Sequence, residues 1–307
     1  MSQDDKNIGR TIAGRYECVE LLGEGGMGTV YRARHLAMKR DVALKLLKKE
    51  ISEDSELMTR FQREMEATST IDSPHTVTVF DYGHTETGEG FLVMELLKGR
   101  SLREYLDRRG PFSIDRLIRI IRQIALALDA AHNANVIHRD IKPGNVLLLQ
   151  NYGDGDWVKV LDFGIAYIDP KAEHEGSLTD QGIVLGSTRY LSPERIQGFA
   201  YDGRSDLYSL GVLTYELATG KTPFVAQDPM VVLNMHVNEP APSLGRDSGE
   251  AYPVWLDALV ADLLAKDPDD RPQSASDVID LIDTVGLQSS PNDGLASAEP
   301  SGDVSPP

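Results

Sequence analysis

The chain has 307 residues, a length that suits one large domain or two lobes that share a cleft. Hydrophobic residues make up 41% and charged residues 26% of it, as in ordinary soluble globular proteins, which argues against a wholly disordered or fibrous chain. The formal net charge of -17 argues against nucleic acid or anionic lipid as a partner, because a basic surface is needed to hold either.

Export and membrane insertion are not expected from this sequence. Cys18 is the only cysteine, which excludes an internal disulfide framework and fits a reducing, cytoplasmic location. Residues 1–15 are polar and carry two aspartates in place of the apolar stretch of a signal peptide. No apolar run reaches the roughly 18 residues that a membrane helix needs, so no membrane span is expected within this chain.

A small mixed lobe is predicted between Tyr16 and Leu97. Short runs rich in β-branched and aromatic residues, at 77–82 and 91–96, are separated by turn residues. A helix is predicted over 54–70, because its apolar residues recur at helical spacing.

Helices are predicted to dominate after Gly99. The longest has Ser113 as its N-cap and an apolar stripe from Ile114 to Leu128. From Gly286 onward large apolar residues are almost absent, which predicts a disordered tail. Further helices are predicted over 205–219, 254–265 and 274–285, the last opened by a Ser-x-x-Asp capping signal.

A glycine-rich string, G-x-G-x-x-G-x-V, follows the first predicted strand. Glycines let backbone N–H groups approach phosphate oxygens without a Cβ in the way. A dinucleotide site is the alternative, but its fingerprint opens a helix, whereas the residues after Gly28 are β-branched and aromatic and continue as a strand. The string therefore predicts a β-hairpin that covers the phosphates of ATP. Its residues are Leu22, Gly23, Glu24, Gly25, Gly26, Met27, Gly28, Thr29 and Val30.

Lys45 ends an apolar strand, Asp41-Val-Ala-Leu-Lys45. Taken alone, such a lysine is usually an edge residue with its head group in water. A buried ammonium that holds phosphates needs a carboxylate beside it, and Glu64 on the predicted helix is the expected partner of Lys45, with Glu66 as the alternative.

The strongest signal is His138-Arg-Asp140-Ile-Lys142-Pro-Gly-Asn145, followed by Asp162-Phe-Gly164. Phosphoryl transfer depends on in-line positioning and neutralised charge. Asp140 therefore suits the orientation of an incoming hydroxyl, and Lys142 suits neutralisation of the transferring group. Asn145 and Asp162 supply the hard oxygen ligands that Mg²⁺ prefers, with Mn²⁺ as an alternative ion. His138 is expected to be structural.

In their order, these motifs resemble the eukaryotic-type protein kinase domain, found in bacteria as well as eukaryotes. The resemblance covers residues 16–285 and implies an α+β, bilobal protein kinase fold, with ATP between a β-rich N-lobe at 16–97 and a mainly helical C-lobe at 98–285. The extension at 1–15 and the tail at 286–307 flank this domain. By the same mapping Met94 is the gatekeeper, Glu95 to Leu97 form the hinge, and Val30, Ala43 and Leu147 sandwich the adenine.

The segment that ends in Ser192-Pro-Glu194 resembles the family's substrate-docking loop and its anchor. Serine stands at 192 where alanine is commoner, and Ser187 stands where threonine is usual; both changes keep size or hydroxyl. The resemblance pairs Glu194 with Arg271 and makes Asp206 a buried support of the catalytic loop. Lys142 resembles the serine/threonine branch, so protein substrates with Ser or Thr acceptors are expected.

Arg139, beside Asp140, suggests control by phosphorylation, since a dianionic phosphate from the activation segment would balance this cation. Ser177 and Thr179 are the candidate phosphosites, and Thr179 matches the family's position better. A transient homodimer is compatible with such autophosphorylation. No substrate consensus is predicted, because Ser101 and Gly144 stand where basophilic kinases tend to carry glutamates.

Two alternatives share the fold or its lobe plan. A pseudokinase scaffold would be favoured by loss of Lys45, Asp140 or Asp162, and all three are present. A small-molecule phosphotransferase is not expected to carry the Ser-Pro-Glu anchor. Bacterial relatives often continue through a linker into a membrane span, so the soluble part of a longer, membrane-anchored kinase is the alternative to a cytoplasmic protein.

Overall fold

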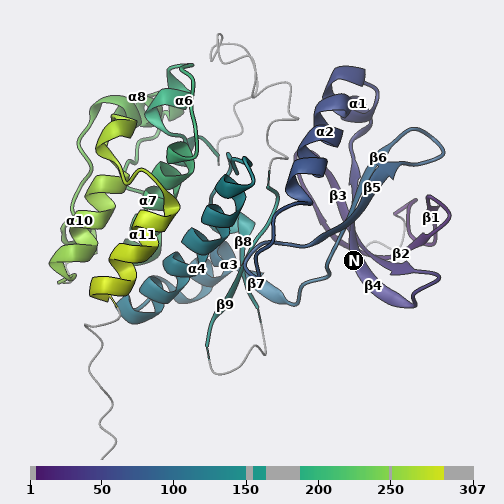
Figure 1. Cartoon of the computed structure of the whole chain (residues 1–307), viewed down its shortest axis with the longest axis horizontal. Coiled ribbons are helices and arrows are strands. Elements are labelled where there is room, and N and C mark those ends of the chain that lie inside the picture. Colours follow the sequence, from purple (N-terminus) through teal and green to yellow (C-terminus); the bar gives the residue numbers. More distant parts are fainter. Residues whose placement is uncertain (1–4, 150–154, 164–186, 249–250, 287–307) are drawn as a thin grey trace, which may run out of the picture.

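The computed structural model describes residues 5–149, 155–163, 187–248 and 251–286. The chain folds into two lobes, a sheet with a covering helix on one side and a helical body on the other (Figure 1). This is the α+β architecture that the sequence predicts.

The N-lobe is built on a six-stranded antiparallel sheet with the order β1-β2-β3-β4-β6-β5. The glycine-rich string lies where β2 turns into β3, so the chain continues as a strand and forms the predicted hairpin. The strands are β1 (Thr11–Ile12), β2 (Tyr16–Glu24), β3 (Gly28–His35), β4 (Arg40–Leu47), β5 (Val79–His84) and β6 (Gly90–Met94).

Strand β4 is buried on both faces, which explains its nearly continuous apolar sequence. Leu44 and Leu46 pack in a cluster on one face, whereas Ala43 and Leu47 pack on the other against the helix. Because side chains alternate along a strand, Lys45 lies on the same face as Ala43 and Leu47. The fold therefore places this lysine beneath helix α2.

Helix α2 (Ser55–Thr68) is the predicted amphipathic helix, preceded by the short α1 (Lys49–Ser52). It begins after Asp54, whose side chain accepts hydrogen bonds from the backbone N–H groups of Glu56 and Leu57. Its apolar face, with Phe61 and Met65 fully buried, packs on the sheet (Figure 1). The carboxylate-bearing positions of the helix are thereby held at a fixed distance from β4.

The C-lobe is organised around α4 (Ile114–Asn133) and α7 (Arg204–Thr219), which share one large hydrophobic core. Ser113 takes the N-cap position of α4 with extended backbone, but its side chain makes no capping hydrogen bond. A small antiparallel sheet, β7 (Gly99–Ser101), β8 (Val146–Leu149) and β9 (Trp157–Val160), lies at the border with the N-lobe. Strand β8 directly follows the predicted catalytic loop, and β9 leads to Asp162.

Shorter helices complete this lobe. Helix α11 begins with the predicted capping box between Ser274 and Asp277. It ends at Leu281 and passes into a π-helical turn, Ile282–Gly286, which extends one residue beyond the predicted range of 274–285. The remaining helices are α3 (Leu102–Arg109), α6 (Pro193–Ile196), α8 (Pro229–Asn238), α9 (Leu244–Ser248), α10 (Val254–Leu263) and α11 (Ala275–Leu281). Within the described ranges, none of the helices has the length and apolarity needed to cross a membrane.

Candidate active site

The glycines of the β2–β3 hairpin have two different reasons to be glycine. A Cβ on Gly28 would lie 2.1 Å from the carbonyl oxygen of Leu46, so the close approach of β3 to β4 requires glycine there. A Cβ on Gly23 or Gly26 would meet no atom within 4 Å. Packing within the chain does not demand glycine at these two positions, which leaves room for a phosphate-bearing ligand.

Lys45 is buried and faces the C-lobe across the gap between the lobes. Its side chain is 9% exposed, and its Nζ lies 3.1 Å from Oδ1 of Asp162. Asp162 follows β9 and has a left-handed backbone, with φ of 58°. The predicted phosphate-binding lysine and one predicted metal ligand therefore meet, although 117 positions separate them in the sequence.

Glu64 does not occupy the position that was expected for it. Its Oε1 accepts a hydrogen bond of 2.9 Å from Nη1 of Arg139, and not from Lys45. Burial alone would lower the pKa of Arg139, but the hydrogen bond and charge of Glu64 outweigh it and raise this pKa. The expected Lys45–Glu64 pair is thus replaced by two pairs, Lys45–Asp162 and Arg139–Glu64. The physical reason is that α2 directs Glu64 at the guanidinium, which is more weakly hydrated than an ammonium and is therefore less costly to pair in a partly buried position.

The catalytic loop brings Asp140, Lys142 and Asn145 together, as predicted. Nζ of Lys142 lies 2.7 Å from Oδ2 of Asp140, and Nδ2 of Asn145 donates to the same oxygen at 2.9 Å. The Asn145 amide also donates to the backbone carbonyl of Asp140 at 2.8 Å. The carboxylate is therefore fixed in orientation through one oxygen, and the donors to it are groups on its own loop.

Asp206 supports this loop from below. It is fully buried and accepts from the backbone N–H groups of His138 and Arg139 at 2.7 and 2.8 Å, and from Nε2 of His132 at 2.9 Å. Burial would raise the pKa of Asp206, but the hydrogen bond and charge of His132, with the donors of the loop, hold this pKa below its ordinary value. The predicted structural role of Asp206 is confirmed by these contacts.

His138 joins the catalytic loop to the strand before Asp162. Its Nε2 donates to the carbonyl of Leu161 at 2.7 Å, and its Nδ1 accepts from the N–H of Asp140 at 3.1 Å. The ring also packs edge-on against Phe163, with centroids 4.5 Å apart. A buried histidine with both nitrogens engaged in the fold is structural, as expected.

Only some of the apolar residues assigned to the adenine site lie in one hydrophobic cluster. Val30, Ala43, Met94 and Leu97 belong to one cluster, in which Ala43 and Met94 are paired across β4 and β6. Leu147 lies on β8 in the smaller sheet and is half-buried. Leu22, near the end of β2, is 47% exposed.

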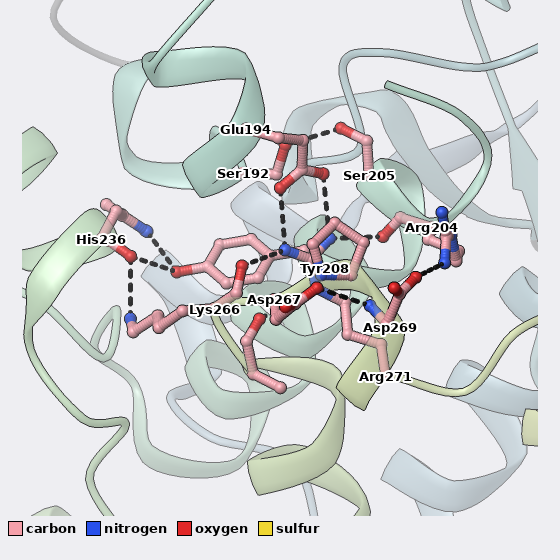
Figure 2. A network of polar contacts seen from close by, with 12 residues as sticks. Ser192, Glu194, Arg204, Ser205, Tyr208, His236, Lys266, Asp267, Asp269 and Arg271 are labelled. Carbon is pink, nitrogen blue, oxygen red and sulfur yellow. Dashed lines mark hydrogen bonds and ion pairs between the residues drawn. The ribbon is translucent and has the colours of Figure 1, made fainter. Parts of the chain in front are cut away.

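The Ser192-Pro-Glu194 anchor is held in the C-lobe by a bidentate ion pair. Nη1 and Nη2 of Arg271 donate to the two carboxylate oxygens of Glu194 at 2.9 and 2.8 Å, and Figure 2 shows this pair at the centre of a polar network. Burial would raise the pKa of Glu194, but the hydrogen bonds and charge of Arg271 lower it. The hydroxyl of Ser192 is 2.7 Å from that of Ser205. The predicted pairing is confirmed, and serine at 192 gains a buried partner.

Comparisons with known proteins agree with this geometry. The family model described as the protein kinase domain matches residues 16–280. The chain belongs to the protein kinase domain family. Serine/threonine-protein kinase pkn3 of Myxococcus xanthus is 41% identical, over 88% of this chain and 50% of its own length. Serine/threonine-protein kinase PknB of Mycolicibacterium smegmatis is 40% identical, over 88% of this chain and 43% of its own length. The chain spans about half, or less, of these curated relatives.

Solved structures show the same fold. The kinase domain of PknI from Mycobacterium tuberculosis superposes with a TM-score of 0.69 at 28% sequence identity. The match covers 92% of this chain and 98% of that one. The bilobal protein kinase fold predicted from the motifs is therefore confirmed.

Several functional contacts of this kinase domain were not predicted from the sequence. Lys159 is buried on β9, and its Nζ lies 2.6 Å from Oε1 of Glu95, in the expected hinge, and 2.9 Å from the carbonyl of Thr76. The same Glu95 oxygen accepts from the N–H of Thr78 at 2.8 Å. The hinge side chain is thus turned away into the fold. The only sequence signal for this contact was the position of Lys159 inside an apolar strand, a position that is equally typical of a lysine at the edge of a sheet.

A second unpredicted contact ties Tyr190, in the segment expected to dock substrates, to helix α3. Nη2 of Arg103 on α3 donates to Glu216 on α7 at 2.6 Å and to the hydroxyl of Tyr190 at 3.1 Å. The Tyr190 hydroxyl also donates to Glu216. Burial and the charge of Glu216 raise the pKa of Tyr190, so the phenol stays protonated. Arg103 carries no motif signal because its partners lie far away in the sequence.

The residues present fit ATP and a divalent cation. Asn145 uses its amide nitrogen to hold Asp140, and this geometry leaves its amide oxygen for a metal ion. Asp162 keeps one carboxylate oxygen beyond the one on Lys45, and its side chain is 33% exposed. Oxygen donors of this kind suit Mg²⁺. The candidate phosphosites Ser177 and Thr179 and the glycine that follows Phe163 lie outside the described residues.

Proposed function

We propose that this kinase domain transfers the γ-phosphate of ATP to serine or threonine residues of proteins. The observation that carries the proposal is the fixed carboxylate of Asp140, held by Lys142 and Asn145 at 2.7 and 2.9 Å. The names of the curated relatives, serine/threonine-protein kinases, support the same acceptor class. The described residues 187–194 and their anchor on Arg271 support a peptide acceptor in preference to a small molecule.

The proposed reaction assigns one role to each residue. The acceptor hydroxyl oxygen forms a bond to the γ-phosphorus as the bond to the β-phosphate oxygen of the leaving ADP breaks, and the hydroxyl proton passes to Asp140. Lys142 balances the charge of the group in transit, and Lys45 holds the phosphates of the nucleotide. Mg²⁺, held by Asn145 and Asp162, would neutralise charge on the phosphate oxygens; Mn²⁺ is the alternative ion.

Mass spectrometry tests the proposal directly. The purified chain is incubated with Mg-ATP and a mixture of protein substrates, and phosphorylated residues are mapped. Phosphoserine and phosphothreonine are expected with the wild-type chain and with Asp280→Asn, which changes an exposed carboxylate on α11. Asp140→Asn is expected to lose them. Absence of phosphate on every protein in the wild-type reaction would contradict the proposal.

We further propose that the Arg139–Glu64 pair marks an unphosphorylated, resting state. A phosphate on Thr179 or Ser177 carries up to two negative charges and would compete with the single carboxylate of Glu64 for Arg139. Glu64 would then be released toward Lys45, which is bound to Asp162 in this structure. Phosphorylation would thereby build the expected Lys45–Glu64 pair and free Asp162 for the metal ion.

This regulation predicts how Arg139→Met behaves. The activity of wild-type protein should rise severalfold or more on autophosphorylation relative to phosphatase-treated protein. In Arg139→Met both forms should have similar activity, because Glu64 no longer has a competing cation and the phosphate has no partner. The Thr179→Ala variant should stay at the activity of phosphatase-treated wild-type protein after incubation with Mg-ATP. An undiminished response to phosphorylation in Arg139→Met would refute this regulation.

The proposed partners and location follow from the activity. Protein substrates with Ser or Thr acceptors are the main partners, and a transient homodimer would suffice for autophosphorylation in trans. The proposed location is the cytoplasm, either as a free protein or as the cytoplasmic part of a longer, membrane-anchored kinase. Size-exclusion chromatography with light scattering, before and after treatment with Mg-ATP, tests the dimer.

A further inference from the structure

The residue before Asp140 has an unusual backbone that requires support from its surroundings. Arg139 has φ of 68°, the left-handed region, which is strained for a residue other than glycine. Such a conformation persists only where neighbouring contacts determine it. On its N-terminal side these contacts come from Asp206, which accepts the N–H groups of His138 and Arg139.

The other side of Arg139 is held by a residue that the motifs do not assign. Nη1 of Arg195 donates to the backbone carbonyl of Arg139 at 2.5 Å. This carbonyl belongs to the peptide group that joins Arg139 to Asp140. The left-handed residue is therefore bonded on its N–H by an aspartate from α7 and on its C=O by an arginine from α6.

Arg195 is an unusual residue to find buried. It is only 8% exposed, and no carboxylate lies within ion-pair distance of it among the residues that the structure describes. Its guanidinium carbon lies 5.3 Å from the centroid of the Tyr201 ring, and its Nη1 donates to the Arg139 carbonyl. Its Nε is buried and has no hydrogen-bond partner within the described part of the chain. Since burying a cation without an acid is costly, stability alone does not account for this residue.

Helix α6 links the Arg195 contact to the Glu194–Arg271 ion pair, because Glu194 and Arg195 are neighbours on this helix. Glu194, the neighbour of Arg195, is bound to the fully buried Arg271 (Figure 2). The segment 187–192 runs directly into this helix. A chain of contacts therefore leads from Arg271 through Glu194 and Arg195 to the peptide group of Asp140.

We propose that Arg195 is a positioning residue for phosphoryl transfer, which sets the peptide plane before Asp140 and couples it to the anchored end of the docking segment. Arg195 touches neither nucleotide nor acceptor in this proposal. Its effect passes through the orientation of Asp140. The test by kcat rests on the proposed kinase function, whereas the test by amide hydrogen exchange does not.

Kinetics test the positioning role. Arg195→Met removes the hydrogen bond, and kcat for a Ser/Thr protein substrate should fall about tenfold to hundredfold, the range for a hydrogen bond to a charged group. KM for ATP should stay within about twofold, because the nucleotide residues lie elsewhere. Arg195→Lys keeps a donor and should recover part of kcat. The control Arg204→Met removes a cation that pairs with Asp202 and Asp269 at the surface, and should leave kcat unchanged.

Hydrogen exchange gives a readout that needs no activity. In Arg195→Met, amide exchange of the catalytic-loop peptide that contains Asp140 should become faster than in the wild type and in Arg204→Met, while exchange of α7 stays the same. If Arg195→Met does not fold, Arg195→Lys is compared in the same two assays. The proposal would be overturned if Arg195→Met had the same kcat and the same amide exchange as the wild type. It would also be overturned if the variant lost kcat and ATP affinity equally. An inactive wild-type chain with faster exchange in the variant would overturn the kinase activity but not the structural link.

Discussion

His236 is a buried imidazole whose surroundings keep it neutral. It is 0% exposed, its Nδ1 lies 2.8 Å from the hydroxyl of Tyr208, and Nζ of Lys266 binds its backbone carbonyl at 2.8 Å (Figure 2). Burial, followed by the nearby charge of Lys266, lowers the pKa of His236 to about 3. The pKa of Lys266 is itself lowered to about 8, chiefly by burial and then by Arg271. Both groups titrate abnormally because they share one buried site.

The lowered pKa of His236 predicts a loss of stability in mild acid. The unfolded chain binds a proton at this histidine below pH 6.5, the ordinary pKa, whereas the folded chain does not until about pH 3. The free energy of unfolding should therefore fall as pH drops below 6.5, by up to about 1.4 kcal/mol per pH unit for this proton. Urea titrations between pH 5 and 6.5 measure this slope.

Two variants assign the slope to one residue. His236→Asn cannot titrate and keeps an acceptor for Tyr208, so its slope between pH 5 and 6.5 should be smaller. Part of the slope should remain, because burial also lowers the pKa of His75. His84→Asn, at an exposed histidine, should match the wild type. An unchanged slope in His236→Asn would show that this histidine is protonated in the folded chain.

Single residues close together in the sequence were predictable, and distant partners were not. Asp140, Lys142 and Asn145 lie within one short motif, so their meeting follows from local geometry and is confirmed by the structure. The partner of Glu64 depends on how α2 is placed against the C-lobe. Two cations, Lys45 and Arg139, compete for it, and no local pattern decides between them.

The β2–β3 hairpin makes a prediction at the scale of one element, because its glycines differ in what surrounds them. Gly28→Ala puts a Cβ 2.1 Å from the backbone of Leu46, so β3 and β4 must separate and the thermal unfolding midpoint should fall by several degrees. Gly26→Ala meets no atom within 4 Å and should leave this midpoint unchanged. Gly26→Ala should instead raise KM for ATP, as its methyl group enters the space proposed for phosphate.

Differential scanning calorimetry and ATP titrations separate the two glycines. Each variant serves as the control for the other: Gly28→Ala should lower the unfolding midpoint, and Gly26→Ala should raise KM for ATP. Equal loss of stability in both variants would contradict the idea that only one glycine is needed for strand packing.

Elements were predicted well where one signal dominates. The β-branched residues after Gly28 correctly favoured a strand over the helix of a dinucleotide site. Helices α2 and α4 follow from their apolar spacing, and α7 and α10 lie where helices were predicted. The observed ends of α2, α7 and α10 differ from the predicted ends by a few residues at most, and α4 continues past its apolar stripe to Asn133. The last residues of α4, Asp129 to Asn133, are small or polar and carry little apolar signal, so the stripe did not fix the end of this helix.

At the scale of the whole molecule, ion pairs among the described residues join the lobes, and two of them use residues at or beside the proposed nucleotide site. Lys45 of β4 reaches Asp162, and Glu64 of α2 reaches Arg139, so both cross from the N-lobe to the C-lobe. Lys45 and Asp162 have roles in the proposed reaction, and Glu64 is the residue proposed to pair with Lys45 after phosphorylation. The relative placement of the lobes and the availability of the catalytic residues are therefore linked, which no inspection of either lobe alone would reveal.

The central claim is that Asp140 orients a serine or threonine hydroxyl for transfer of the γ-phosphate. Its most direct test is the steady-state rate of transfer from Mg-ATP to matched peptides that differ only in a Ser, Thr or Tyr acceptor, for the wild type and for Asp140→Asn. Transfer to Ser and Thr but not Tyr is expected, with kcat about a hundredfold or more lower in Asp140→Asn and KM for ATP little changed. Equal rates for the wild type and Asp140→Asn, or preferential transfer to tyrosine, would contradict the account.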